Sequence, residues 1–327
     1  MTIYNITHIS DLDGMASAAL LVKNFGIPLE NIFFFDYSAS IFSAMREEIM
    51  SRNPRNSLFI LSDAGVNQQI VKSCANLAAF LKKNGNSIMW LDHHVWNDES
   101  IRMLSKYASL MIVGENSYCC GADIVYKLLC RNDPKSEKLV ELTHISDLYL
   151  KPKSNAQRAI LERYAFGIKY LNMQEDENRN AKLRKLIYFL SIGKINNSLI
   201  KNAHSRYKKI FIKSVKILDD SAQTIKAGRI KIALGFAPDL QSTFAAHRLR
   251  IRNKVQIGAY VNTSRIRDSP TCSLRSAGKT SCLYIAERFG GGGHPHACAF
   301  KVPKRYNIAT KEGREAFIKR FAKLAAP

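Results

Sequence analysis

Short apolar runs and helical patterns alternate along the first third of the chain. Runs of β-branched and aromatic residues predict strands at residues 4–9, 31–35, 58–61 and 88–91. Apolar residues at helical spacing predict the intervening helices at 15–25, 41–50 and 67–83. This alternation predicts an α/β fold, with a parallel sheet that carries helices on both faces.

The pattern changes further along. Residues 119–147 predict two helices, and residues 155–227 stay helical and polar without strand signals. Alternating apolar and polar positions then predict strands at 229–236, 255–261 and 271–274, followed by a helix at 280–288. We therefore predict a first domain over 1–190, a helical connector over 191–228 and a smaller α/β domain over 229–327.

The charge of the chain favours a polyanionic partner. Its 327 residues include 49 Lys and Arg against 27 Asp and Glu, a net charge of +22. Residues 194–254 hold 14 basic and 3 acidic residues, half of that excess. Two interpretations of this segment stay open: a positive wall that faces a phosphate-bearing substrate, or a solvated helix face.

The same composition argues against a membrane or secreted protein. No apolar run approaches the ~20 residues that span a bilayer, and Asp11 and Asp13 lie where a signal peptide would be apolar. The seven cysteines are odd in number and lack C-x-x-C spacing, which favours free thiols in the core. We expect a cytoplasmic protein without a membrane partner.

Carboxylates and imidazoles follow three of the predicted strands, and such strand ends share one edge of a parallel sheet. In chain order these residues are His8, Asp11, Asp13, Asp63, Asp92, His93 and His94. Asp147 ends a predicted helix, and His144, one turn earlier, is a rival ligand candidate.

Structural roles could explain some of these residues singly. Asp11 could cap the helix that follows, and Asp63 could be a turn residue. Capping needs one carboxylate, however, and two adjacent histidines after a buried strand are hard to explain by packing. Together, so many acidic groups would repel one another without cations.

Two divalent ions about 3.5–4 Å apart would bind this set and hold a hydroxide for attack on phosphorus. Mixed Asp and His ligands favour Mn²⁺, with Mg²⁺ and Co²⁺ as alternatives. Near the C-terminus, the glycines at 290–293 would let backbone amides approach an anion, with His294 as a further donor and Arg275 able to fork onto a phosphate. The alternative for the glycine run is a flexible turn.

In this order the motifs resemble those of the DHH-family phosphoesterases that carry a DHH-associated domain. The resemblance implies that His8, Asp11 and Asp63 hold one metal, while Asp13, Asp63, His93 and Asp147 hold the second. It further implies that His94 contacts the reacting phosphate and that Asp92 orients the two histidines.

The resemblance extends to the second domain. It implies that the substrate end is held by Ser273, Arg275, Gly292, Gly293 and His294, with the active site in a cleft between the domains. Two positions depart from the family pattern: Ala299 replaces a final glycine and Cys298 replaces an alanine. His296 is an additional imidazole without an assigned role.

Among DHH-family enzymes, the compact two-domain form resembles the nanoRNases of the NrnA type. These cut short oligonucleotides to 5′-mononucleotides and dephosphorylate 3′-phosphoadenosine 5′-phosphate (pAp). Alternatives are a cyclic-dinucleotide phosphodiesterase, a single-strand-specific 5′–3′ exonuclease and, from another class, a non-catalytic nucleotide- or nucleic-acid-binding protein. The resemblance leaves a homodimer open.

Overall fold

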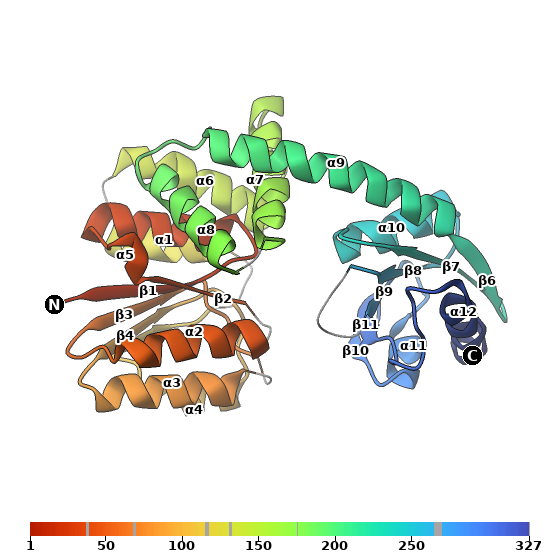
Figure 1. Cartoon of the computed structure of the whole chain (residues 1–327), viewed down its shortest axis with the longest axis horizontal. Helices are drawn as coiled ribbons and strands as arrows, with labels where there is room; N and C mark the ends of the chain where they lie inside the picture. The colour runs from red at the N-terminus through yellow and green to blue at the C-terminus, as the bar shows by residue number, and fades with distance from the viewer. Residues whose placement is uncertain are drawn as a thin grey trace. The chain divides into compact units, whose positions relative to one another are not determined.

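The computed structural model describes residues 1–36, 39–67, 70–114, 118–130, 133–174, 176–264 and 270–326. They form two compact units, Met1–Tyr207 and Lys208–Pro327 (Figure 1). The boundary falls within α9 (Ser198–Ser221), a long helix inside the predicted connector. Within the described ranges, no helix is both long enough and apolar enough to cross a membrane.

The first unit is built on a parallel sheet with the strand order β2-β1-β3-β4-β5. Its strands are β1 (Ile3–His8), β2 (Ile32–Phe35), β3 (Leu58–Ser62), β4 (Ser87–Leu91) and β5 (Leu110–Ile112). The four predicted strands are confirmed, and β5 is an addition. The chain leaves β1 toward β2 on one side and later continues through β3 on the other. Ligands in such sheets bind where the strand order reverses, here beyond the ends of β1 and β3.

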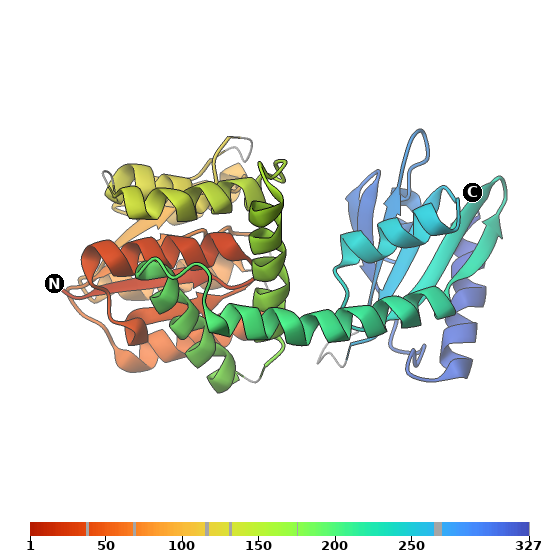
Figure 2. The same cartoon turned by 90° about the horizontal axis from the view of Figure 1, so that it is seen from above.

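Helices cover both faces of this sheet, as predicted (Figures 1 and 2). One layer contains α1 (Leu12–Phe25), α5 (Gly121–Leu129), α6 (Pro134–Asp147), α7 (Asn155–Asn172) and α8 (Asp176–Ser191). The other contains α2 (Ala39–Arg52), α3 (Val71–Lys83) and α4 (Asp98–Ser105). Alternation along β3 serves both layers, because Ile60 packs into the first core and Phe59 and Leu61 into the second.

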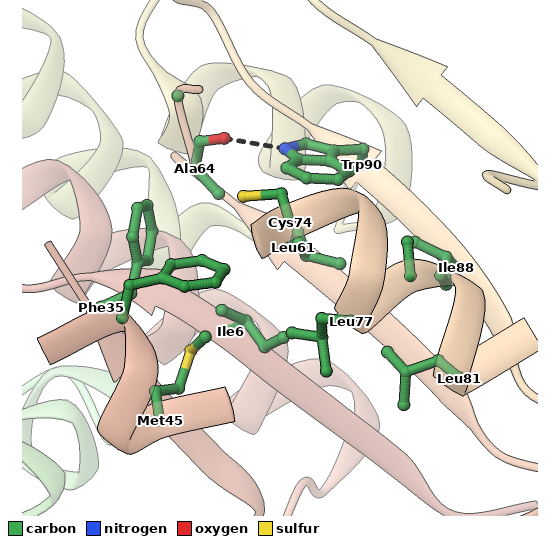
Figure 3. A pocket seen from close by; sticks show the side chains of 13 residues that line it. Ile6, Phe35, Met45, Leu61, Ala64, Cys74, Leu77, Leu81, Ile88 and Trp90 are labelled. Carbon is green, nitrogen blue, oxygen red and sulfur yellow. Dashed lines mark hydrogen bonds between the residues drawn. The ribbon is translucent and has the colours of Figure 1, made fainter. Parts of the chain in front are cut away.

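The second of these cores contains a small apolar cavity of about 20 Å³, lined among others by Ile6, Leu61 and Leu77 (Figure 3). Trp90 borders it and donates its indole N–H to the carbonyl of Ala64 at 2.8 Å. A cavity of this size has room for about one water molecule, and its apolar wall offers that water no partners. The cavity is therefore a packing gap and not a ligand site.

The second unit has a six-stranded mixed sheet in the order β10-β11-β9-β8-β7-β6. Its strands are β6 (Gln223–Ala227), β7 (Ile230–Ala237), β8 (Ile257–Asn262), β9 (Thr271–Ser276), β10 (Gly292–His294) and β11 (Ala297–Lys301). Strands β7 and β8 are parallel, and the other pairs are antiparallel. Helix α10 (Ser242–Arg252) packs on one face, and α11 (Leu283–Arg288) and α12 (Lys311–Ala325) on the other.

Some boundaries differ from the prediction. Residues 223–227, expected in the helical connector, form strand β6, in which Ile225 and Ala227 are buried between exposed neighbours. Part of the glycine run forms strand β10. The first helix begins at Leu12, before the predicted start at residue 15, so Asp13 lies in its first turn.

Candidate metal-binding active site

The site begins where β1 turns into α1. The start of α1 packs directly on the end of β1, because a Cβ on Gly14 would lie only 2.0 Å from the carbonyl oxygen of His8. Asp11 caps α1, accepting hydrogen bonds from the amides of Asp13 at 3.1 Å and Gly14 at 3.4 Å. Its other carboxylate oxygen lies 3.6 Å from Nδ1 of buried His8. Asp11 therefore caps the helix and faces the imidazole at the same time.

The carboxylate of Asp13 is buried against the N-terminus of α5. Its Oδ2 accepts from the amide of Gly121 at 2.6 Å, and its Oδ1 accepts from the amide of Ala122 at 2.7 Å. These amides belong to the first turn of a helix, where no intrahelical carbonyl is available and the helix dipole favours an anion. The two bonds fix the orientation of the carboxylate across a large sequence separation.

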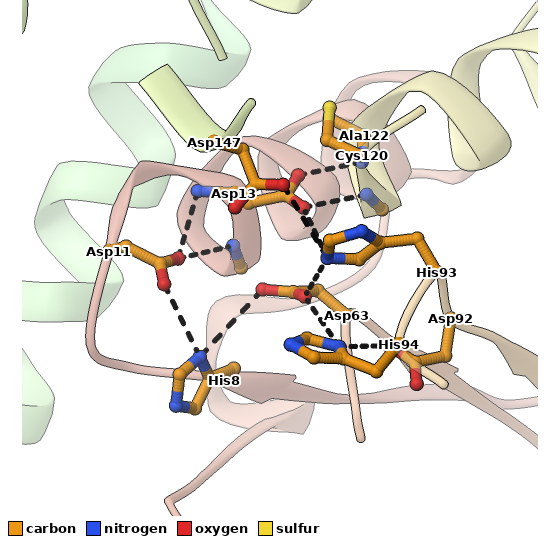
Figure 4. A network of polar contacts seen from close by, with 12 residues as sticks. His8, Asp11, Asp13, Asp63, Asp92, His93, His94, Cys120, Ala122 and Asp147 are labelled. Carbon is orange, nitrogen blue, oxygen red and sulfur yellow. Dashed lines mark hydrogen bonds and ion pairs between the residues drawn. The ribbon is translucent and has the colours of Figure 1, made fainter. Parts of the chain in front are cut away.

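Asp63 lies between His8 and His93 in the site (Figure 4). It follows β3 with φ of 49°, a left-handed conformation that Asp adopts more readily than most residues. Its Oδ2 is 3.8 Å from Nδ1 of His8, and its Oδ1 is 3.5 Å from Nε2 of His93. The carboxylate of Asp63 thus faces one imidazole with each of its oxygens.

The residues after β4 complete the cluster. Nε2 of His93 lies 3.7 Å from Oδ2 of Asp13 and 3.6 Å from Oδ2 of Asp147, which ends α6. Asp92 is fully buried; its Oδ1 lies 2.8 Å from Nδ1 of His94 and its Oδ2 accepts from the indole of Trp96 at 2.7 Å. Trp96 was not predicted from the sequence, and it fixes the carboxylate that orients His94.

The ligand-type atoms fall into two adjacent groups, each with its atoms within 4.8 Å of one another. The groups are His8 with Asp11 and Asp63, and Asp13 with His93 and Asp147. The Asp63–His93 contact joins them, and Asp63, His93 and His94 make a further overlapping group. The structure therefore brings the eight predicted residues from four separate segments to one edge of the sheet (Figure 4).

Burial and mutual repulsion shift the ionisation of these side chains. Burial, and then the charge of a neighbouring carboxylate, raises the pKa of Asp13 and of Asp63 well above the usual value. Burial lowers the pKa of His8 and of His93, so their imidazoles are neutral at neutral pH. Burial would also lower the pKa of His94, but the hydrogen bond to Asp92 and its charge outweigh this, and the net shift is upward.

This set of side chains fits divalent cations. Among the described residues, neither ring nitrogen of His93 nor Oδ2 of Asp63 has a hydrogen-bond partner, although all three atoms are buried. Unpartnered buried polar atoms are costly unless a ligand satisfies them. Neutral imidazole nitrogens and carboxylate oxygens are the forms that coordinate Mn²⁺, and the cations would offset the repulsion between the carboxylates.

His144, the rival ligand candidate, lies beside this centre in a different set of contacts. Its Nδ1 is 2.6 Å from Oδ2 of Asp123, which also accepts from the amide of Cys120 at 2.9 Å. The Asp123–His144 contact joins α5 to α6. Helix α5 holds Asp13 and α6 ends at Asp147, so this pair connects two of the elements that build the site.

The predicted substrate-binding residues lie in the second unit. The Arg275 guanidinium donates to Thr243 Oγ1 at 2.8 Å, and Ser273 is buried on β9. His294 is exposed on β10, as are both glycines of that strand. Gly293 has φ of 137°, and a Cβ there would lie 2.6 Å from the carbonyl oxygen of Ala297, whereas a Cβ on Gly292 would meet nothing within 4 Å.

The fold is an α/β domain, and its carboxylates and neutral imidazoles gather where the strand order of the parallel sheet reverses. Such a cluster is typical of a metal-binding site. Residues 2–151 match the family model described as the DHH family, N-terminal domain. This part of the chain, which contains the whole Asp/His cluster, is therefore similar to the N-terminal domain of DHH-family proteins. No curated protein sequence matched the chain significantly.

Solved structures share the fold at low sequence identity. The DHH domain of a protein described as belonging to a family of ribosomal proteins is 15% identical, with a TM-score of 0.60, over 98% of this chain and 87% of that one. PggH from Vibrio cholerae, described as a pGpG-specific phosphodiesterase, is 13% identical, with a TM-score of 0.54, over 98% and 99%. An exopolyphosphatase-related protein from Bacteroides fragilis is 13% identical, with a TM-score of 0.51, over 99% and 92%.

Proposed function

We propose that the chain is a Mn²⁺-dependent phosphodiesterase that hydrolyses short oligonucleotides to 5′-mononucleotides and also converts pAp to AMP. The observation that carries the proposal is the pair of adjacent Asp/His groups joined at Asp63, inside a DHH-family domain. Paired cation sites of this kind suit in-line displacement at phosphorus.

His8, Asp11 and Asp63 would hold one cation, and Asp13, Asp63, His93 and Asp147 the other. When bound, the cations supply positive charge to the phosphate and lower the pKa of a bound water to generate the nucleophile. Asp13 enters this set with its orientation already fixed by two backbone amides, which reduces the reorganisation needed on loading.

His94 is proposed to contact the reacting phosphate. Asp92 orients His94 through Nδ1, and the His94 side chain is one-third exposed, so the imidazole would reach a bound phosphate. The raised pKa favours the protonated imidazole, which can donate a hydrogen bond to a non-bridging phosphate oxygen as its charge grows in the transition state.

The second unit is proposed to hold the other end of the substrate. Arg275, whose guanidinium donates to Thr243 and to the Leu274 carbonyl, would turn its remaining N–H groups to a phosphate, and His294 and the exposed Gly292 lie on the same sheet, two strands away. Holding a terminal nucleotide in this way would favour short chains. The pGpG specificity in the description of PggH supports a dinucleotide as the first substrate to test, since pGpG is a two-nucleotide chain.

A substrate panel with Mn²⁺ tests the proposal. It contains pGpG, a second 5′-phosphorylated diribonucleotide, pAp, cyclic di-AMP and a long single strand, with Asp63→Asn as the control variant. We expect mononucleotides to be released fastest from the dinucleotides, and turnover to be lost in the variant. Preference for cyclic di-AMP would support a cyclic-dinucleotide phosphodiesterase, and preference for the long strand would support a single-strand-specific exonuclease.

Metal binding distinguishes the non-catalytic alternative. Calorimetric titration should show Mn²⁺ binding to the wild-type chain and weaker binding to Asp63→Asn. A chain that binds Mn²⁺ and nucleotides but hydrolyses no member of the panel would be a binding protein, and the proposed activity would be wrong.

A further inference from the structure

Two buried cysteines meet behind the glycine hairpin of the second unit. The Sγ atoms of Cys282, which precedes α11, and Cys298, on β11, are 3.2 Å apart, with the Cys298 thiol as donor. Both side chains are buried. A disulfide requires about 2.05 Å between the sulfurs, so they would have to approach by about 1.1 Å.

The surroundings make Cys282 the reactive member of the pair. The hydrogen bond from Cys298 lowers the pKa of Cys282, so Cys282 loses its proton more readily than Cys298 does. The same contact raises the pKa of Cys298, which stays a thiol. Cys272, buried on the neighbouring strand β9, has its pKa raised by burial alone and provides an internal comparison.

The pair is tied to the strands that carry the proposed substrate groups. Cys298 is opposite Gly293 of β10 on one side and Leu274 of β9 on the other. The amide of Cys282 donates to the carbonyl of Pro295 at 2.7 Å, and the Cys282 thiol donates to the same oxygen at 3.3 Å. Pro295 forms part of the turn between β10 and β11, so these contacts connect Cys282 to that turn.

We propose that Cys282 and Cys298 form an oxidation site in which a hydroperoxide converts the two thiols to a disulfide that restrains the β10–β11 hairpin. The Cys282 thiolate attacks a peroxide oxygen; a sulfur–oxygen bond forms, the oxygen–oxygen bond breaks, and the released hydroxide is protonated to water. The Cys298 sulfur then loses its proton and attacks the Cys282 sulfur, forming the disulfide and releasing a second water. Overall, two thiols are oxidised and one hydrogen peroxide is reduced to two waters.

Thiol mapping tests the covalent step. The full chain, reduced and kept metal-free with a chelator, is treated with hydrogen peroxide, alkylated under denaturing conditions and digested for mass spectrometry. We expect two of the seven thiols to be lost, a Cys282–Cys298 linked peptide, and recovery of both thiols with dithiothreitol. Cys272 should stay alkylatable. Unchanged thiols, a different pairing, or Cys282 oxidised to the sulfinic acid without a bridge would overturn the proposal.

Two variants separate chemistry from folding. Cys298→Ala introduces the residue that the family pattern has at this position, so we expect it to fold; its Cys282 should be oxidised without forming a bridge. Cys272→Ala should still form the bridge. A bridge from Cys282 to another cysteine in Cys298→Ala would show that the assigned pair is wrong.

The effect on the hairpin rests on the proposed function and has a separate readout. For hydrolysis of a diribonucleotide, oxidation should change KM on the order of tenfold, since the two sulfurs must approach by about 1.1 Å and the hairpin moves with them. Dithiothreitol should reverse the change, and Cys298→Ala should not show it. An unchanged KM in fully bridged protein would refute control of the hairpin. If the reduced protein hydrolyses nothing, the proposed function fails while the thiol map still decides the oxidation site.

Discussion

Replacing Gly121 with alanine tests whether the first turn of α5 holds the two central carboxylates in place. The added Cβ would lie 2.8 Å from Cβ of Asp63 and 3.1 Å from Oδ2 of Asp13. Carbon atoms in contact normally stay about 3.5–4.0 Å apart, so α5 or Asp63 must move by roughly 0.7 Å or more. Helix α5 cannot move alone, because the amide of Gly121 is hydrogen-bonded to Asp13.

The expected effect on stability is modest and the effect on activity is large. Overpacking of this kind costs about 1–3 kcal/mol of unfolding free energy, and the higher helix propensity of alanine offsets up to about 1 kcal/mol. The protein should therefore stay folded. A displacement near 1 Å in a reacting site lowers the rate about 10²-fold, which is the loss of Mn²⁺-dependent hydrolysis that we expect for Gly121→Ala.

Three measurements are needed: thermal unfolding, calorimetric titration with Mn²⁺, and steady-state hydrolysis of a diribonucleotide. Gly114→Ala is the matched control, because its Cβ would lie 3.4 Å from the carbonyl oxygen of His93, an ordinary contact beside the same site. The reasoning is refuted if Gly121→Ala binds Mn²⁺ and turns over like the wild type, or if Gly114→Ala loses as much activity.

Three further predictions concern the two units separately. Arg275→Ala should raise KM for a diribonucleotide several-fold and leave Mn²⁺ binding unchanged, since Arg275 lies in the second unit; an unchanged KM would remove its proposed role. His144→Ala should lose about 1 kcal/mol of unfolding free energy, because the contact between α5 and α6 is lost. The variant should also bind Mn²⁺ more weakly in a titration, and wild-type affinity would show that Asp147 keeps its position without the His144–Asp123 contact. For the metal-free protein, the raised pKa of Asp13 means that the folded state binds more protons than the unfolded state. This contribution to stability is therefore fully present below the ordinary carboxyl pKa of 3.8 and is lost as pH rises through the folded pKa. Subtracting the thermal unfolding profile of Asp13→Asn from that of the wild type in chelator should show this decline, and a difference that grows with pH would contradict it.

Much of the first unit follows from the local pattern of the sequence. Its strands and helices are set by apolar periodicity, and parallel strands necessarily bring their carboxyl ends to one edge. His8 ends such a strand, and Asp63 and His93 follow two others, so their proximity could be expected before any coordinates. The capping role of Asp11 was also predictable, because the side chain, its position and the helix are all local.

The remaining features depend on contacts between distant segments. The sequence shows no reason for Asp13 to meet the amides of Gly121 and Ala122, since the bonds span more than a hundred residues and arise only when α1 and α5 pack. Strand β6 was misassigned because its polar alternating residues resemble the exposed face of the preceding helix until they pair with β7.

Residue identity and spacing alone therefore predicted which side chains could bind metal ions and roughly where they would lie. Only the tertiary structure decided which side chains are in contact. Asp63 faces the imidazoles of His8 and His93, His144 contacts Asp123, and Cys282 contacts Cys298. The physical reason is that periodicity and capping are local properties of the backbone, whereas these contacts depend on how separate elements pack against one another.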